Sequence, residues 1–302
     1  MIEQHHGEVR YVQFGHFLQF PDLIHASFSR LGGYSKTPYW GLNVSYSIGD
    51  DFENVVHNRL LALQALQIET YPCATLWMVH GAEVAILEDS WDDWRTDWAH
   101  RSYRVDQHEL IWTTKPRRKA DALITRHRGV ALAMSSADCV SLMFYDPVEI
   151  VIGMAHAGWR GTARGIAAAT IDAMSEQFGS LPRNIRVGIG PSIGSCCYEV
   201  TDEVRNFFMG QQDFDPDRTD VRYRKLVRES AVFDVKRLYG RNSLRLDMWE
   251  TNRNQLHMSG VLPEHIESSE ICTSCEKERF FSHRGEHGKA GRFPSILALR
   301  DG

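Results

Sequence analysis

The sequence predicts an α/β fold, because strongly apolar runs alternate with segments of helical periodicity. Residues 130–134 (VALAM) and 150–155 (IVIGMA) are continuously apolar, as in strands that are buried on both faces. Residues 52–68 place apolar side chains at helical spacing, and residues 158–179 read as a loop followed by a long helix. Functional side chains in such folds gather at the ends of strands.

The N-terminal part reads as strands and turns that lead into the first helix. In residues 1–50, apolar runs are interrupted by Gly and Asn residues, which favour turns. Asn43 lies in an expected loop, and one interpretation is that it is a turn residue. After the helix over residues 52–68 and the break at Pro72, residues 74–87 form two strand-like runs separated at His80 and Gly81.

Residues 86–119 differ in composition from the rest of the chain. Three Trp residues lie among acidic residues, and the segment ends in a basic cluster. We expect a surface excursion, such as a hairpin or a lid, whose Trp side chains either pin it to the body or stack on a ligand. The sequence contains neither repeats nor a low-complexity linker, so it offers no boundary at which residues 1–302 could be divided into domains.

The C-terminal half is predicted to alternate helices with short strands and loops. Thr162 is a candidate N-cap of the helix that ends at Gly179. A strand over residues 185–190 follows, then helices over residues 202–209 and 246–260 with a polar loop at 211–225 between them.

Reactive side chains follow both apolar runs, which suggests one shared site. They are Ser135, Ser136, Asp138 and Cys139 after the first run, and His156, Trp159 and Arg160 after the second. A thiol and an imidazole delivered in this way are either two metal ligands or a nucleophile with its base. Arg160 next to a helix start suits an anion such as phosphate, or else pairs with one of the protein's own carboxylates.

The six cysteines do not form a disulfide framework and read as reduced thiols. The adjacent Cys196 and Cys197 are interpreted as packed thiols. Cys272 and Cys275 have C-x-x-C spacing and, with His283 and His287, give a weak signal for structural zinc. Ser282, His283 and Arg284 follow Phe280 and Phe281 and are interpreted as another polar strand end that faces the site.

Composition and charge exclude several classes of protein. The formal net charge of −5 is opposite to the basic footprint of most nucleic-acid-binding proteins. The N-terminus lacks the pattern of a signal peptide, and no apolar run reaches the roughly 18 residues of a membrane span. We therefore expect a cytoplasmic protein, with neither nucleic acid nor membrane as a partner.

An ordered set of short motifs resembles the multicopper polyphenol oxidase-like, or laccase-domain, family, whose members are described as purine nucleoside phosphorylases. The motifs are VHG at 79–81, ADC at 137–139, HAGWRG at 156–161, IGP at 189–191, CT at 272–273, FFSHR at 280–284 and GR at 291–292. The resemblance implies a single-domain, three-layer α/β sandwich with a mixed sheet, similar to cysteine hydrolases. The chain departs from the family at Met78, where Gln is frequent, and in the length of the 86–119 excursion.

The resemblance also implies a site and an activity. In the family, the residues that match His80, Cys139 and His156 bind one Zn²⁺, which leaves an open fourth position typical of catalytic zinc. The implied reactions are phosphorolysis of adenosine, inosine and methylthioadenosine, and deamination of adenosine. From their positions, we expect catalytic roles for Asp138, Cys139 and His283, with substrate binding by Asn43, Arg160 and Arg284.

Three other functions fit the same residues. A copper-dependent polyphenol oxidase (laccase) would replace zinc by copper, although a multicopper enzyme needs more His ligands. An amide hydrolase that edits cell-wall precursors would use Cys139 as nucleophile and His156 as base. A metal-stabilised binding module would carry no reaction. For the enzyme, the expected partners are a small purine nucleoside and phosphate, in a monomer or small homo-oligomer.

Overall fold

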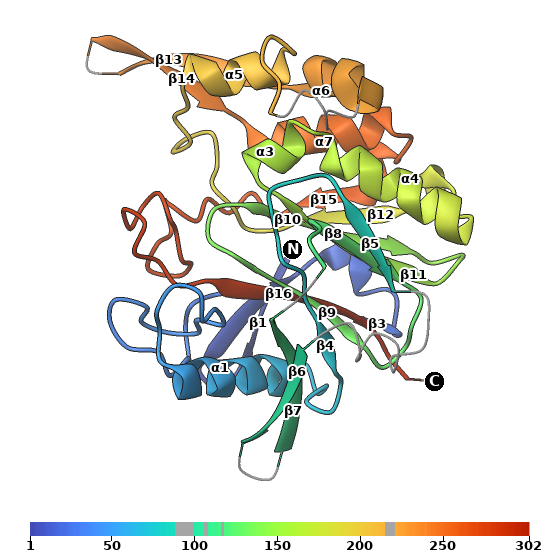
Figure 1. The fold of residues 1–302 in the computed structure, drawn as a ribbon, viewed down its shortest axis with the longest axis vertical. Coiled ribbons are helices and arrows are strands. Elements are labelled where there is room, and N and C mark those ends of the chain that lie inside the picture. Colours follow the sequence, from blue (N-terminus) through green and yellow to red (C-terminus); the bar gives the residue numbers. More distant parts are fainter. Residues whose placement is uncertain (88–98, 106–107, 116–117, 215–220, 239, 302) are drawn as a thin grey trace.

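The computed structural model describes residues 1–87, 99–105, 108–115, 118–214, 221–238 and 240–301 (Figure 1). Two large sheets stack face to face, and helices cover the outer face of each sheet. The described chain therefore forms four layers, in the order helix, sheet, sheet, helices.

The first sheet has eight strands in the order β1-β2-β3-β16-β9-β4-β7-β6. Its neighbours pair antiparallel except at β4, which is parallel to both β7 and β9. The strands are β1 Ile2–His6, β2 Val9–Gln13, β3 Leu23–Phe28, β4 Cys73–Ala74, β6 Ala99–Val105, β7 His108–Lys115, β9 Ala131–Ser136 and β16 Phe293–Leu299.

Helix α1, Phe52–Ala65, covers the outer face of this first sheet. Its apolar stripe, which includes Val56, Leu60 and Leu63, packs against Ala133 and Ile296 of the sheet. Asp51 caps the helix, because its side chain accepts the N–H of Asn54 at 3.1 Å.

The second sheet has six strands in the order β15-β12-β10-β11-β8-β5. Two pairs are parallel, β5 with β8 and β12 with β15, and the others are antiparallel. The strands are β5 Val84–Leu87, β8 Ala122–Thr125, β10 Val140–Asp146, β11 Val151–Ala157, β12 Arg186–Ile189 and β15 Ile266–Ser268.

Helices α3 Trp159–Thr162 and α4 Ile166–Phe178 pack on the outer face of the second sheet, and α7 Met248–Met258 packs against both. Helices α5 Asp202–Phe208 and α6 Arg224–Ser230 lie further from the sheet (Figure 1). A two-stranded hairpin, β13 Phe233–Leu238 and β14 Arg241–Leu246, lies beside them. Short 3₁₀ helices are η1 Gly15–Phe17, η2 Pro182–Asn184, η3 Val221–Tyr223 and η4 Pro263–His265.

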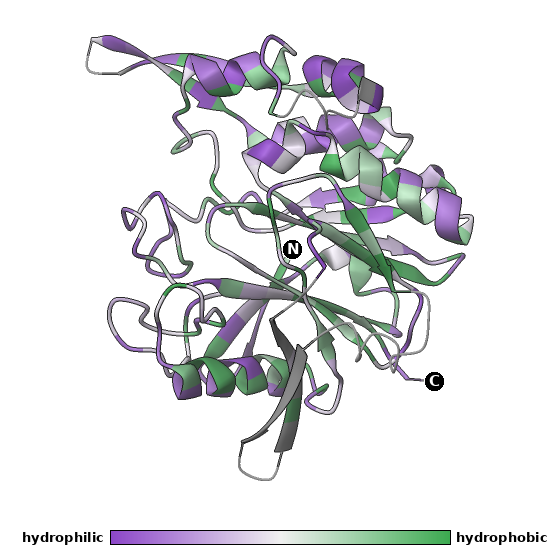
Figure 2. Ribbon diagram, in the orientation of Figure 1, coloured by the Kyte–Doolittle hydropathy of each residue, from purple (hydrophilic) through white to green (hydrophobic). Residues whose placement is uncertain are grey.

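Successive side chains of the central strands point to opposite faces of the sheet and therefore pack in different cores. In β9, Leu132 and Met134 point between the sheets, whereas Ala131 and Ala133 point toward α1. In β11, Ile152 and Met154 point between the sheets in the same way. Both faces of the central strands are therefore apolar, and Figure 2 shows these strands as mostly hydrophobic, with hydrophilic residues on the outer helices.

The α/β class, the mixed sheet, the two apolar strands and the helices near residues 52–68 and 166–178 are confirmed. The three-layer arrangement is wrong, because β9 and β10 belong to different sheets that stack on one another. A strand buried on both faces shows no alternation, so its sequence does not tell which sheet it joins.

Two local predictions of the C-terminal half are also wrong. Thr162 ends the short helix α3, and the N-cap of α4 is Gly165, in a left-handed conformation with φ 80°. Gly179, by contrast, is the C-cap as predicted. Phe280 and Phe281 lie in an irregular loop and not in a strand.

The excursion at 86–119 is described only in part, and its Trp residues at 91, 94 and 98 lie outside the described residues. The described part contains the antiparallel hairpin of β6 and β7 at the edge of the first sheet. Leu110 and Trp112 of β7 are buried in the core beneath α1, so this hairpin contributes to packing.

None of the described helices combines the length and the apolar character that crossing a membrane would require.

Candidate metal centre and its cavity

The candidate centre lies where the chain passes from the first sheet to the second. Strand β9 ends at Ser136, and β10 begins at Val140, so Asp138 and Cys139 form the short link between the sheets. Asp138 has φ 83°, a left-handed conformation that Asp adopts more readily than most residues, and it produces the sharp turn. His156 lies opposite Ser141 in the β10–β11 ladder, which places it next to this link.

His80, Cys139 and His156 converge at this point. Their ligand atoms all lie within 4.8 Å of one another. His156 is buried, Cys139 is half-buried and His80 is exposed. The rings of His80 and His156 have centroids 5.0 Å apart. One thiol and two imidazoles are a donor set typical of zinc, and three protein ligands with one exposed side leave room for a further ligand.

The buried carboxylate of Asp121 holds two of these residues in place. Its Oδ1 lies 3.0 Å from Nδ1 of His156, so the ring presents Nε2 as its remaining nitrogen. The same carboxylate accepts the backbone N–H groups of Val79, His80 and Gly81 at 3.1, 3.0 and 2.7 Å. Sequence reasoning missed Asp121, because an Asp before a buried strand has no distinctive spacing.

Gly158 is the second residue that sequence reasoning did not single out. A Cβ at this position would lie 3.1 Å from Sγ of Cys139, 3.3 Å from Nδ1 of His80 and 3.6 Å from Cε1 of His156. Its φ of −66° is open to any residue, so space and not backbone conformation explains the glycine. The three ligands therefore surround a small space that a methyl group would enter, and this fits a bound ion.

The two imidazoles differ in protonation when no cation is bound. Burial alone would lower the pKa of His156, but Cys139 and Asp121 outweigh it and raise the pKa to about 10. Burial and the neighbouring His156 lower the pKa of His80. His80 is therefore neutral at pH 7, the form that binds metals, whereas a metal at His156 must displace a proton.

A cavity of about 460 Å³ opens over the three ligands. Three arginines reach it, namely Arg160 from helix α3 and Arg284 and Arg292 from loops. Among the described residues that line it, Asp138 is the only carboxylate. The cavity thus combines a candidate metal-binding group with an excess of positive charge, which suits an anionic ligand. The other lining residues that the sequence did not single out as ligand contacts include Ser45, Ser47, Ile193, Tyr198 and Met248.

The three arginines are held differently. Arg160 is exposed, stacks on Trp159 at 4.3 Å and forms no ion pair with any described residue, which leaves its guanidinium available. Arg284 donates from Nη1 to the backbone oxygen of Glu199 at 2.9 Å. Arg292 donates to Ala290 and Gly291 oxygens, and burial lowers its pKa.

The helix start beside Arg160 is that of the four-residue helix α3, in whose first turn Arg160 lies, and not that of the long helix that the sequence predicted. The long helix α4 begins at Ile166, six residues beyond Arg160 and directly after the left-handed Gly165, where a Cβ would meet Tyr223. Charge at the cavity therefore comes from arginine side chains.

Asp138 joins the two loops that face it. Its Oδ1 accepts the hydroxyl of Thr273 at 2.6 Å, and its Oδ2 accepts the backbone N–H of Arg284 at 2.6 Å. The carboxylate thus fixes the loop that carries His283 and Arg284, both of which are exposed and line the cavity. Each oxygen retains a lone pair for a further hydrogen bond.

The predicted substrate contact of Asn43 is not supported, because Asn43 is fully buried and does not line the cavity. Its Oδ1 accepts the N–H groups of Ser45 and Arg292 at 3.1 and 2.9 Å. Its Nδ2 donates to Ser45 and Asp50. Asn43 therefore shapes the loop behind Ser45 and Arg292, which agrees with its interpretation as a turn residue.

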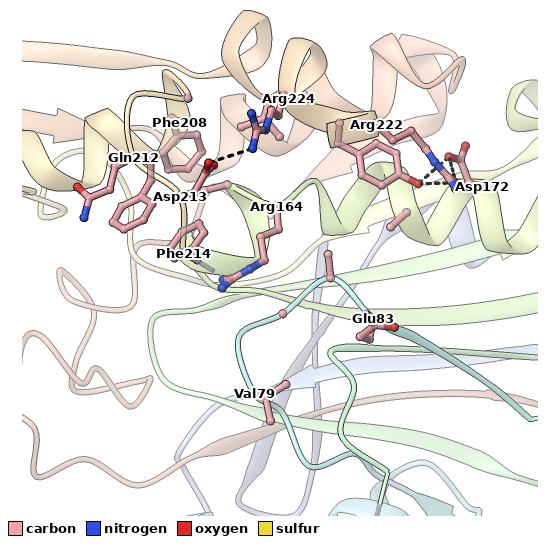
Figure 3. A pocket seen from close by; sticks show the side chains of 18 of the residues that line it. Val79, Glu83, Arg164, Asp172, Phe208, Gln212, Asp213, Phe214, Arg222 and Arg224 are labelled. Carbon is pink, nitrogen blue, oxygen red and sulfur yellow. Dashed lines mark hydrogen bonds and ion pairs between the residues drawn. The ribbon is translucent and has the colours of Figure 1, made fainter. Parts of the chain in front are cut away.

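A second cavity of about 480 Å³ is lined by residues from the turn at 79–83, from helix α4 and from the segments 207–214 and 222–227, and is shown in Figure 3. Phe208 and Phe214 contribute apolar surface, and Arg164 lies over the ring of Phe214 at 3.7 Å. Asp213 pairs with Arg224 at 3.0 Å, and Asp172 and Glu176 pair with Arg222 at 3.7 and 3.8 Å. None of His80, Cys139 and His156 lines it, so the chemistry belongs to the first cavity.

Comparison with known proteins gives a match over most of the chain. Residues 24–300 match the family model described as multi-copper polyphenol oxidoreductase laccase. Purine nucleoside phosphorylase YlmD of Geobacillus stearothermophilus is 35% identical over 272 residues, which cover 89% of this chain and 88% of that protein. Adenosine deaminase RL5, from an unknown prokaryotic organism, is 28% identical over 261 residues, which cover 85% of this chain and 86% of that protein.

Solved structures show the same fold. The crystal structure of YlmD from Geobacillus stearothermophilus aligns with a TM-score of 0.78 at 31% identity and covers 99% of each chain. The crystal structure of Bacillus licheniformis hypothetical protein YfiH aligns with a TM-score of 0.77 at 28% identity, again over 99% of each chain.

Asp121→Asn should weaken zinc binding about 10- to 100-fold, the usual effect of removing a partner that orients a ligand. The amide keeps the volume but removes the charge that fixes the His156 ring. Zinc affinity is measured by competition with a chromophoric chelator. Asp146→Asn is the matched control, because Asp146 is an equally buried carboxylate that accepts only the nearby N–H groups of Val148 and Glu149. Equal affinities in both variants would contradict the role of Asp121.

Gly158→Ala should fold normally but lose most of its zinc affinity, because the added methyl group enters the space between the three ligands. Zinc content after dialysis and the thermal unfolding midpoint are measured together. Gly15→Ala is the control, since a Cβ there meets only side-chain atoms of Glu267 at ordinary contact distances of 3.7 and 3.8 Å. Full zinc occupancy in Gly158→Ala would show that the ion is bound elsewhere.

Proposed function

The chain belongs to the multi-copper polyphenol oxidoreductase laccase family, and from this premise we propose that it is a zinc-dependent purine nucleoside phosphorylase that also deaminates adenosine. Adenosine, inosine or methylthioadenosine would react with phosphate to give the free base and the 1-phosphate of the ribose. The observation that carries the proposal is one cavity that joins a His/Cys/His group with three arginines.

The names of similar proteins support this choice of reaction. Proteins named purine nucleoside phosphorylase in Geobacillus stearothermophilus and Bacillus subtilis align with most of the chain at 35% and 30% identity. A protein named adenosine deaminase aligns at 28% identity. One cavity would serve both reactions, because both act on a bound purine nucleoside.

In phosphorolysis, the arginines bind and orient the second substrate. Arg160, Arg284 and Arg292 hold a phosphate dianion, and charge-assisted hydrogen bonds from guanidinium groups suit its geometry. A phosphate oxygen attacks the anomeric carbon of the ribose, while the bond from that carbon to the purine nitrogen breaks and its electron pair leaves with the base. His283, exposed at the cavity, supplies a proton to the departing base.

In deamination, water attacks C6 of adenine and the amino group leaves as ammonia. His80, Cys139 and His156 would hold the zinc, which when bound supplies Lewis acidity for this attack. Asp138 carries the proton from the water to the leaving amino group, because it is the only carboxylate among the described lining residues. Met78 lines the same cavity and offers an apolar contact to the purine ring.

Copper-dependent polyphenol oxidation is less well supported by the donor atoms. Among the described residues, one candidate group of metal ligands contains histidine, and it consists of two His and one Cys. An enzyme with several coppers needs more imidazole ligands than this group offers.

The geometry favours a second candidate function, an amide hydrolase. His156 lies between Asp121, 3.0 Å from its Nδ1, and Cys139, whose charge raises the His156 pKa. This order of thiol, imidazole and carboxylate is that of a cysteine nucleophile with its base and the group that orients the base. Amide bonds in cell-wall precursors would be its substrates. His80 has no role in such a mechanism, and this separates the two candidates.

Zinc-loaded protein should convert adenosine to adenine only when phosphate is present, and to inosine with or without phosphate. Chelation or His80→Ala should abolish both products, because two ligands alone do not hold a catalytic zinc. Adenine, inosine and ribose 1-phosphate are separated by chromatography. Hydrolysis of an amide substrate by the His80→Ala variant, without nucleoside turnover in the parent protein, would instead establish the hydrolase.

Arg160→Ala should raise the phosphate concentration needed for half-maximal phosphorolysis about 10- to 150-fold, which corresponds to about 1.5–3 kcal/mol for a charge-assisted hydrogen bond. Deamination should change much less, because it needs no anion beside the ribose. Arg205→Ala removes the same charge from an exposed pair with Asp202 and serves as the control. An equal loss of both activities in Arg160→Ala, with zinc retained, would assign Arg160 a structural role.

A further inference from the structure

Four cysteines gather at a second place, on the wall behind the cavity. Cys196 and Cys197 lie in the turn after β12, and Cys272 and Cys275 lie in the loop after β15. The Sγ atom of Cys275 is 3.5 Å from that of Cys196 and 3.4 Å from that of Cys197. All four sulfur atoms lie within 4.8 Å of one another.

These positions correct both sequence-based interpretations of the cysteines. Cys196 is exposed and Cys197 is half-buried, so neither is a packed core thiol. The partners of the C-x-x-C pair are these two cysteines, and His283 instead lines the cavity over the first centre. Apolar packing therefore does not explain why four thiols point at one another near the surface.

Backbone hydrogen bonds hold the two loops in register. The N–H of Ser192 donates to the oxygen of Ile271 at 3.2 Å, and the N–H of Thr273 donates to the oxygen of Ser192 at 3.1 Å. The N–H of Gly194 donates to Sγ of Cys272 at 3.3 Å. Arg245 donates to the backbone oxygen of Cys196 at 2.8 Å. The four sulfur atoms are thus brought together by the fold itself, and one of them already accepts the N–H bond that metal thiolates often accept.

We propose that Cys196, Cys197, Cys272 and Cys275 bind a second, structural zinc ion. Zinc lies about 2.3 Å from each thiolate, so a tetrahedral site places its sulfur atoms about 3.8 Å apart. The distances of 3.4 and 3.5 Å and the upper limit of 4.8 Å bracket this value. Four protein ligands complete the coordination of zinc, which makes this a closed site, unlike the three-ligand centre in the cavity.

Four sulfur atoms this close to one another suit a bound cation. Four neighbouring thiols cannot all ionise alone, whereas zinc replaces their protons and neutralises half of the resulting charge.

The position of this second site gives it a role in shaping the cavity. Tyr198, which lines the cavity, directly follows Cys197. Thr273, which binds Asp138, directly follows Cys272. Arg284 then ties the two loops together through the oxygen of Glu199. A zinc ion at the four cysteines therefore fixes both walls without touching the substrate.

Metal analysis of protein purified under reducing conditions tests the proposal. The parent chain should contain two zinc ions, and Cys275→Ser, at an exposed ligand, should contain one. His80→Ala should also contain one, and the double variant none, so each loss is assigned to its own site. Cys73→Ala, which changes a buried cysteine outside both groups, should keep two. The second site remains testable even if the proposed enzymatic function is wrong, because the experiment measures the zinc content of the protein and does not depend on enzymatic turnover.

Cobalt spectra of the parent chain provide a measurement that does not depend on the folding of a variant. Cobalt bound at four thiolates should give a strong thiolate-to-cobalt absorption that persists in His80→Ala, together with four thiols that become reactive only after chelation. One zinc ion in the parent chain, an unchanged count in Cys275→Ser, or a mass two hydrogens lower because a disulfide joins these cysteines would overturn the proposal.

Discussion

The carboxylate of Asp121 is the interaction on which the candidate centre depends. It is fully buried, and burying a charge is costly unless hydrogen bonds replace its hydration. Three backbone N–H groups and the His156 ring supply those bonds. Because these donors come from the turn at residues 79–81 and from strand β11, one charge positions two ligands that are far apart in sequence. His80 has φ 57°, a conformation that this hydrogen-bonded turn maintains.

The second constraint is the stacking of two sheets, which forces the chain to cross between them. Asp138 and Cys139 occupy one crossing, so polar side chains can reach a cavity there without interrupting either apolar core. Close contact between layers also requires small residues. A Cβ at Gly188 of β12 would lie 2.4 Å from the ring of Phe14, so only glycine lets that ring pack on the sheet. The rigid two-sheet core thus fixes Cys139 and His156, whereas helix α3 supplies Arg160 and loops supply Arg284 and Arg292.

Much of this arrangement could be predicted from the sequence, for identifiable reasons. Continuous apolar runs marked β9 and β11, and reactive residues directly after them pointed to one site. The sequence could not reveal the fourth layer, because strands apolar on both faces carry no sign of their sheet. It could not reveal Asp121, whose partners are backbone groups 40 and more residues away. Asn43, expected as a substrate contact, is buried and bonded to its own loop, and the sequence does not distinguish such a side chain from one that faces a ligand.

Donor chemistry separates the two groups of ligands in this chain. The group in the cavity has two imidazoles, one exposed side and a glycine that keeps the space between its ligands open. Such a set leaves a position for a reactant. The four cysteines would complete the coordination of a zinc ion. They lie between two loops and do not line the cavity. Their loops carry Tyr198 and Arg284, which line the cavity, and Thr273, which donates to Asp138. The first group therefore suits chemistry, and the second suits the task of holding the shape in which that chemistry would occur.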